Sequence, residues 1–267
     1  MTDQVLASCR EHLRDPGTRL WMVVGMCWAI LLIGGHRHGL LPGSSPGEHS
    51  GLAAALLVFT GSWLVMIGAM MLPTMVPMVR LFNLASARAP HPTVTQGAFL
   101  AGYVTLWVVF ALISLIAATT IQAALGQSKW LAGHPHWVLA AMLALAGGFQ
   151  FSQLKDRCLT QCRDPGAFLF SRYQRGIRAA WSLGLRHGMS CLGCCWALML
   201  VMFGTGIGNL LAMLLLTVVM LVEKTARWGK QASRPVGVML LLAALMIVLF
   251  GSGSVSPPAA LDILCPG

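Results

Sequence analysis

Three cysteines fall within five positions of the chain, in the stretch CLGCCW at residues 191–196. The surrounding segment is apolar and also contains His187. On a helix, His187, Cys191 and either Cys194 or Cys195 recur about once per turn and therefore share one stripe. Thiolate and imidazole groups select Cu(I) or Zn(II) rather than Mg²⁺ or Ca²⁺. The stripe predicts a soft-metal site, and the alternative is close helix packing through small Cys and Gly residues.

A second set of soft donors lies earlier, in the segment AMMLPTMVPM at residues 69–78. Met71, Met75 and Met78 have the i, i+4, i+7 spacing of one helix face. The two prolines of the segment predict a kinked helix with freed carbonyl groups. Thioether ligands shift the predicted metal toward Cu(I), with Zn(II) as the second choice. The alternative is that these methionines only fill the core.

Two further cysteines, Cys158 and Cys162, lie in the polar segment LKDRCLTQCRDPG. Their i, i+4 spacing places both thiols on one face of a short helix. Pro165 and Gly166 are expected to end that helix. The pair is either a metal-exchanging or regulatory dithiol or a pair of structural cysteines.

The elements that position these donors are long apolar helices. The chain has 267 residues, of which 57% are hydrophobic and only 10% are charged, and its mean hydropathy is +0.74. Soluble domains carry more charge than this, and many of the uncharged runs approach the roughly 20 residues that cross a bilayer. The sequence predicts an all-α, polytopic transmembrane bundle of about seven spans, and the alternative is six spans with a marginal N-terminal one. The expected helices are 20–37, 52–80, 97–124, 136–154, 182–203, 207–226 and 236–252.

Basic residues orient this bundle. With seven spans, 16 of the 18 Lys and Arg residues fall on one side, and only Arg37 and Lys129 fall on the other. The positive-inside rule therefore predicts a cytoplasmic N-terminus and a multi-pass protein of the bacterial inner membrane. The predicted division of the chain is a cytoplasmic segment 1–19, a transmembrane domain 20–252 with a basic cytoplasmic loop 155–181, and an outer tail 253–267. A net charge of +10 favours anionic lipid headgroups, and not nucleic acid, as the partner of the basic face.

In this topology the second span runs inward and the fifth runs outward, so the methionines and the CLGCCW cysteines occupy the same leaflet. Glu223, in the segment TVVMLVEKTARW, reaches the same depth. It is either a further metal ligand or the partner of Lys224, Arg227 or Arg186 in an ion pair. The sequence thus predicts that the cysteine, methionine, His187 and Glu223 donors all lie near the cytoplasmic face of the membrane.

Four blocks of the sequence resemble a known family. The blocks AMMLPTMVP, GGFQFSQLKDRCLTQCRDP, GLRHGMSCLGCCWALM and NLLAMLLLTVVMLVEK resemble, in order and spacing, the signature blocks of the bacterial domain of unknown function 2182. That family is described as predicted metal-binding integral membrane proteins, and the resemblance covers about residues 50–230. Phe149 stands where the family usually has tyrosine. The resemblance implies metal binding and names no reaction.

The first functional hypothesis is a membrane protein that binds a soft metal, copper above all, and transfers it to or from a metal-donor or metal-acceptor protein. Cys191, Cys194, Cys195 and His187 would form the tight site, and the methionines would be transit ligands. The second hypothesis is an enzyme that uses Cys191 and Cys194 as a membrane dithiol. The third is a non-catalytic assembly subunit. Nothing resembles a nucleotide-binding loop, a hydrolase triad or a carboxylate pair, which argues against hydrolytic chemistry.

Overall fold

The computed structural model describes residues 16–36, 52–126, 136–205 and 209–250, and every regular element in these ranges is a helix. The all-α fold class is confirmed for this part of the chain. The first part of segment 1–19, the tail 253–267 and the two outer basic residues Arg37 and Lys129 lie outside it. The helices are α2 (Pro16–His36), α3 (Leu52–Met70), α4 (Leu72–Ser86), α5 (Pro92–Gly126), α7 (His136–Phe149), α8 (Gln153–Arg163), α9 (Pro165–Arg172), α10 (Ile177–Thr205), α11 (Leu210–Thr225) and α12 (Gly229–Phe250).

Among the described residues, four helices are long and apolar enough to cross a membrane, and the number rises to six if each of two bent helix pairs is one span. These helices are compatible with a membrane protein. The 16 residues of α11 extend over about 24 Å, short of the roughly 30 Å hydrocarbon core. Seven spans and a cytoplasmic N-terminus therefore stay predictions.

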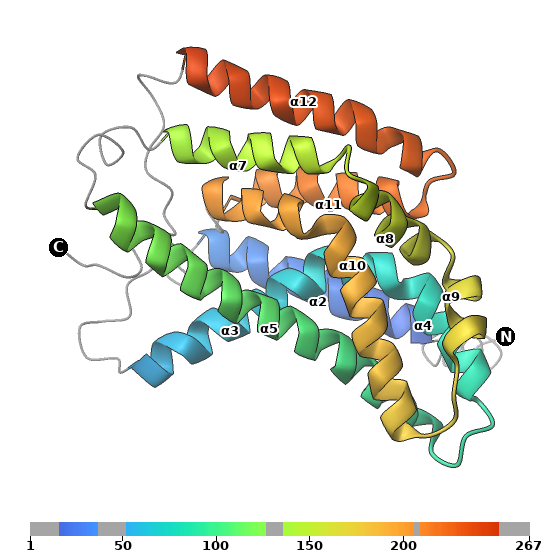
Figure 1. Cartoon of the computed structure of the whole chain (residues 1–267). Coiled ribbons are helices and arrows are strands. Elements are labelled where there is room, and N and C mark those ends of the chain that lie inside the picture. The colour runs from blue at the N-terminus through green and yellow to red at the C-terminus, as the bar shows by residue number, and fades with distance from the viewer. Residues whose placement is uncertain (1–15, 37–51, 127–135, 206–208, 251–267) are drawn as a thin grey trace, which may run out of the picture.

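The segments that carry most of the basic residues gather at one end of the bundle. Figure 1 shows the α4–α5 connection, α8, α9 and the α11–α12 connection on the same side of the molecule. Arg88, Arg163, Arg172 and Arg227 belong to these segments. This is the arrangement that the positive-inside argument requires of a single membrane face.

The first bent pair breaks beside the methionine segment. The sequence predicted one kinked helix over 52–80, whereas the structure has two helices, α3 and α4, that meet at Met71 with a bend of 72°. Pro73 lies in the first turn of α4, where its missing N–H breaks no helical hydrogen bond. The carbonyl of Ala69, four residues earlier, instead accepts a hydrogen bond from Trp28 Nε1 at 3.2 Å. The break is thus stabilised by α2.

The second bent pair, α7 and α8, turns by 67°. Ser152 caps the new helix, and its side chain accepts a hydrogen bond from the Lys155 amide at 3.1 Å. The helix ends at Arg163, where Asp164 begins to cap α9 and Pro165 occupies the first turn of α9. The predicted short helix with its stop at Pro165 is therefore present, and it turns Cys158 and Cys162 toward the bundle.

Helices α5 and α10 form the most extensive helix pair of the structure and cross in Figure 1. Two glycines permit the close approach: Gly102 of α5 faces the Trp181 carbonyl, and Gly184 of α10 faces the Phe99 carbonyl. A Cβ atom at either glycine would overlap that carbonyl oxygen. Small residues at such crossings are the usual means of tight packing between membrane helices.

We therefore expect Gly184→Ala to destabilise the fold by about 1–3 kcal/mol, because the added methyl group overpacks a backbone contact. Thermal unfolding in detergent measures the effect. Gly148→Ala is the matched control, since a Cβ there meets no atom within 4 Å. Equal melting temperatures for the two variants would contradict the close α5–α10 contact.

Candidate functional site

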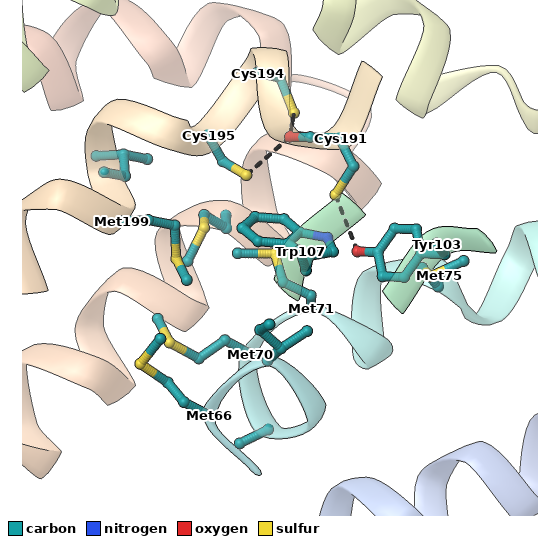
Figure 2. Close-up of a cluster of buried hydrophobic side chains, with 14 of the residues drawn as sticks. Met66, Met70, Met71, Met75, Tyr103, Trp107, Cys191, Cys194, Cys195 and Met199 are labelled. Atoms are coloured by element: carbon teal, nitrogen blue, oxygen red, sulfur yellow. Dashed lines mark hydrogen bonds between the residues drawn. The ribbon is translucent and has the colours of Figure 1, made fainter. Parts of the chain in front are cut away.

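Sulfur-containing side chains from α3, α4 and α10 meet beside the α3–α4 break (Figure 2). Met70, Met71 and Met75 come from this break and from α4, and all three are fully buried. The cysteines of CLGCCW come from α10, and their exposed fractions are 2% or less. Cys162 of α8 joins them from the end of the bundle. Thioether and thiol donors that are far apart in the sequence thus share one buried region.

Cys191 lies at the centre of the polar contacts in this region. Its Sγ is 3.2 Å from the hydroxyl of Tyr103, which belongs to α5 and is fully buried. Lys224 of α11 donates a hydrogen bond from Nζ to the same sulfur at 3.1 Å. Cys191 therefore connects α5, α10 and α11 through one sulfur atom.

The thiols of Cys194 and Cys195 turn back onto their own helix. Each donates a hydrogen bond to the Cys191 carbonyl, at 3.0 Å and 2.9 Å. Cys194 Sγ also lies 3.9 Å from Cys162 Sγ, so the structure brings the two predicted cysteine groups together. All six cysteines in the described ranges are free thiols.

Helix α8 is held against α10 by close contacts at Gln161 and Cys158. Ser190 donates a hydrogen bond to Gln161 Oε1 at 2.7 Å. Cys158, which is half-buried, packs on Gly193, where an added Cβ would lie 2.5 Å from the Cys158 sulfur. Cys162 therefore faces the buried sulfur region, and Cys158 lies at its edge.

Lys224 is the residue of this region that the sequence interpretation missed as a site residue. Its exposed fraction is 7%, and its Nζ reaches Met71 Sδ at 3.9 Å and Thr74 Oγ1 at 3.5 Å in addition to Cys191. The available signal was a lysine in the last turn of an apolar 16-residue helix, because ionisable residues of membrane helices usually face the bundle interior.

Glu223 has a different partner from any that the sequence suggested. Its Oε2 is 2.7 Å from Lys155 Nζ of α8, rather than from Lys224, Arg227 or Arg186. Lys155 also donates to Gln150 Oε1. Glu223 thus forms an ion pair, as one of the two predictions stated, but its partner is a lysine 68 positions away.

Arg163 strengthens the same junction. It donates hydrogen bonds to the backbone carbonyls of Glu223 at 2.6 Å and Arg227 at 3.1 Å. Helix α8 is therefore fixed to the end of α11 twice, by the buried ion pair in its first turn and by the backbone contacts of its last residue.

His187 lies in an aromatic environment one turn before Cys191. Its ring centroid is 5.3 Å from that of Phe168, 6.1 Å from that of Tyr103 and 6.2 Å from that of Phe99. The residue is buried, and its Nδ1 has no hydrogen-bond partner. An uncommitted ring nitrogen at this depth is free to act as a ligand.

In the described part of the chain, no group of three or more His, Cys, Asp or Glu side chains is arranged to hold a metal ion. The predicted tight site of Cys191, Cys194, Cys195 and His187 is therefore not preassembled from these four residues. The reason is visible in the contacts, because two thiols bond the Cys191 carbonyl and Lys224 contacts the third. The donors that do converge include Cys162 and Met71, which belong to other helices.

Residues 60–247 match the model of a family described as PpoB2, copper chaperone. The chain belongs to this copper chaperone family. No curated protein and no solved structure matches the chain. Membership in the PpoB2 family indicates a copper-related function and supports the metal-related family that the four sequence blocks predicted. The name domain of unknown function 2182 stays a prediction.

The segment that matches the PpoB2 family contains all of the predicted ligands, from Met71 to Glu223. Its donor set suits copper: thiols and thioethers prefer Cu(I), and few hard oxygen ligands compete. Copper is the cargo of a chaperone, so a site of exchangeable ligands fits this family better than a closed four-ligand cage.

Proposed function

We propose that this chain binds Cu(I) inside the membrane and transfers it to or from a partner protein at the bacterial inner membrane. The observation that carries the proposal is the approach of Cys162 on α8 to Cys194 on α10, at 3.9 Å, beside Cys191 and Met71. Soft donors on separate helices can close around one ion with small side-chain movements.

In this proposal Cys162, Cys191 and Cys194 are the principal ligands. Met71 adds a thioether from the α3–α4 break, and His187 supplies its uncommitted Nδ1 as a further donor.

Met75 and Met78, both buried on α4, are transit ligands. The remaining predicted residues are not principal ligands. Cys158 lies at the cytoplasmic edge of the site, and Cys195 is an additional thiol on α10. Glu223 supports the site through its ion pair.

The orientation with the N-terminus in the cytoplasm and seven spans belongs to the same proposal. It puts α8 and α9 at the cytoplasmic face, where a soluble metal-donor or metal-acceptor protein can approach Cys158. Copper then moves between a half-buried thiol and buried ones. Because the ligands are soft and few, the ion stays exchangeable.

The proposal is tested by loading anaerobically purified full-length protein with Cu(I) or Zn(II) in separate samples. We expect about one equivalent of copper to survive desalting, less zinc, and transfer of that copper to a thiol-rich acceptor, as the soft donor set requires. A protein that retains zinc in preference to copper, or neither metal, would contradict the proposed cargo.

Met71→Leu is expected to weaken Cu(I) affinity by about tenfold while changing stability by less than about 1.5 kcal/mol, because leucine keeps the volume and removes the thioether. Met66→Leu is the matched control: Met66 is equally buried but lies on α3, before the break. Competition titration with a Cu(I) chelator measures both variants. The same loss of affinity in both would exclude a specific role for Met71.

A further inference from the structure

The ammonium group of Lys224 lies among the donors proposed for copper. It contacts Cys191 Sγ at 3.1 Å, Met71 Sδ at 3.9 Å and Thr74 Oγ1 at 3.5 Å. Two of these three partners are soft sulfur atoms on different helices. The position of Nζ is therefore one at which a cation is held by a thiol and a thioether.

Lys224 has no carboxylate to balance it. The neighbouring Glu223 directs its Oε2 to Lys155, and in the described ranges no carboxylate oxygen lies within salt-bridge distance of Lys224 Nζ. An ammonium buried without a carboxylate is costly. A residue placed at such a cost, at the junction of the soft donors, is better explained by the site than by folding alone.

We infer that Lys224 holds the cation position of the sulfur site when copper is absent and makes bound Cu(I) exchangeable. The inference rests on the proposed function. Cu(I) and the ammonium each carry one positive charge, and they compete for the sulfur atoms of Cys191 and Met71. Because two like charges repel strongly in a low-dielectric interior, copper can bind these sulfurs only when the ammonium leaves them.

The lysine side chain is suited to this exchange. It is a flexible four-carbon chain with a compact charge, and it can turn away from Cys191 without movement of α11. When copper leaves, the ammonium returns to the sulfur atoms. Lys224 thus lowers the affinity of the site and speeds release to an acceptor.

A lysine with only a structural role gives a different result. Its removal would lower the stability of the metal-free protein and leave the Cu(I) dissociation constant unchanged. The two roles are separated by measuring affinity, release rate and melting temperature on the same samples.

The experiment uses Lys224→Leu and Lys224→Gln in the full-length protein, with Lys230→Leu as the control at an exposed lysine of α12. The Cu(I) dissociation constant comes from competition with a chromophoric chelator, and the release rate comes from transfer to an excess of that chelator. Both Lys224 variants are expected to bind Cu(I) about tenfold to a hundredfold more tightly and to release it correspondingly more slowly, because a charge-assisted hydrogen bond no longer competes. The control is expected to match wild type.

Unchanged or weaker affinity in the Lys224 variants would overturn the inference, and so would the failure of both variants to fold, which would mark Lys224 as structural. Wild-type protein reports on the proposed function separately. If wild type binds no copper, the proposed function fails, whereas copper binding that is insensitive to Lys224 removes only the role of the lysine.

Discussion

Replacing Cys191 and Cys194 together by serine is expected to remove copper from the purified protein and to weaken Cu(I) affinity by at least about a hundredfold. The physical reason is that a hydroxyl is a hard ligand and a poor match for Cu(I), while serine keeps nearly the volume of cysteine. Elemental analysis after desalting and competition titration measure the loss. The far-ultraviolet circular dichroism of the variant is expected to match wild type.

Cys27→Ser is the matched control for this experiment. Cys27 is also a buried thiol, but it belongs to α2, where it packs on Gly68. It should retain full copper. If the Cys191→Ser/Cys194→Ser variant also kept its copper, the cysteines of α10 would not be ligands. Trapping of a Cys191–Cys194 disulfide in cells would then favour the dithiol enzyme.

Lys155→Met is the second substitution with a large expected effect, which is a loss of folding stability. Lys155 and Glu223 form a salt bridge at 2.7 Å, with exposed side-chain fractions of 1% and 2%. Removal of one partner leaves the other charge buried and unpaired, at an expected cost of about 3–5 kcal/mol. Thermal unfolding in detergent measures the loss, with Lys230→Met as the exposed control.

The double variant Lys155→Met/Glu223→Leu separates the pair from its parts. Replacing both charges with apolar side chains is expected to restore most of the stability, because no buried charge remains. A melting temperature of Lys155→Met equal to that of wild type would contradict a buried ion pair. The single variant should also lose copper affinity, since Lys155 and Cys162 share α8 and the pair fixes this helix to α11.

Many residues of this site could be predicted from helix periodicity, because spacing along one helix predicts which side chains share a face. It identified the α10 cysteine stripe and the helical Cys158 and Cys162 pair, and the proline and glycine at 165–166 predicted where that helix ends. The approach of Cys162 to Cys194 could not be read in the same way. It depends on the 67° bend between α7 and α8, which sets where the end of α8 arrives.

Two errors of interpretation have the same origin. The sequence suggested Lys224, Arg227 or Arg186 as the partner of Glu223, whereas the partner is Lys155 of α8. Lys224 was then considered only as a partner for Glu223, although consecutive residues on a helix point in directions about 100° apart. That geometry sends Glu223 toward α8 and Lys224 toward Cys191 and Met71. The sequence interpretation therefore assigned the wrong contacts to both charges.

The α3–α4 break shows where helix periodicity alone could not predict the positions of the methionines. A continuous helix would place Met71, Met75 and Met78 on one stripe. In the structure Met71 is the N-cap residue of α4, at the 72° bend, and it lies next to Lys224. Proline predicted a distortion, but its direction depends on α2, whose Trp28 bonds the freed Ala69 carbonyl.

Copper K-edge X-ray absorption of the Cu(I)-loaded wild-type protein tests the central claim most directly, because it reports the atoms bound to the metal. We predict a first shell dominated by sulfur, with about two or three sulfur ligands, and one sulfur fewer in Cys162→Ser. A first shell made only of nitrogen and oxygen would contradict a copper site built from the cysteines of α8 and α10.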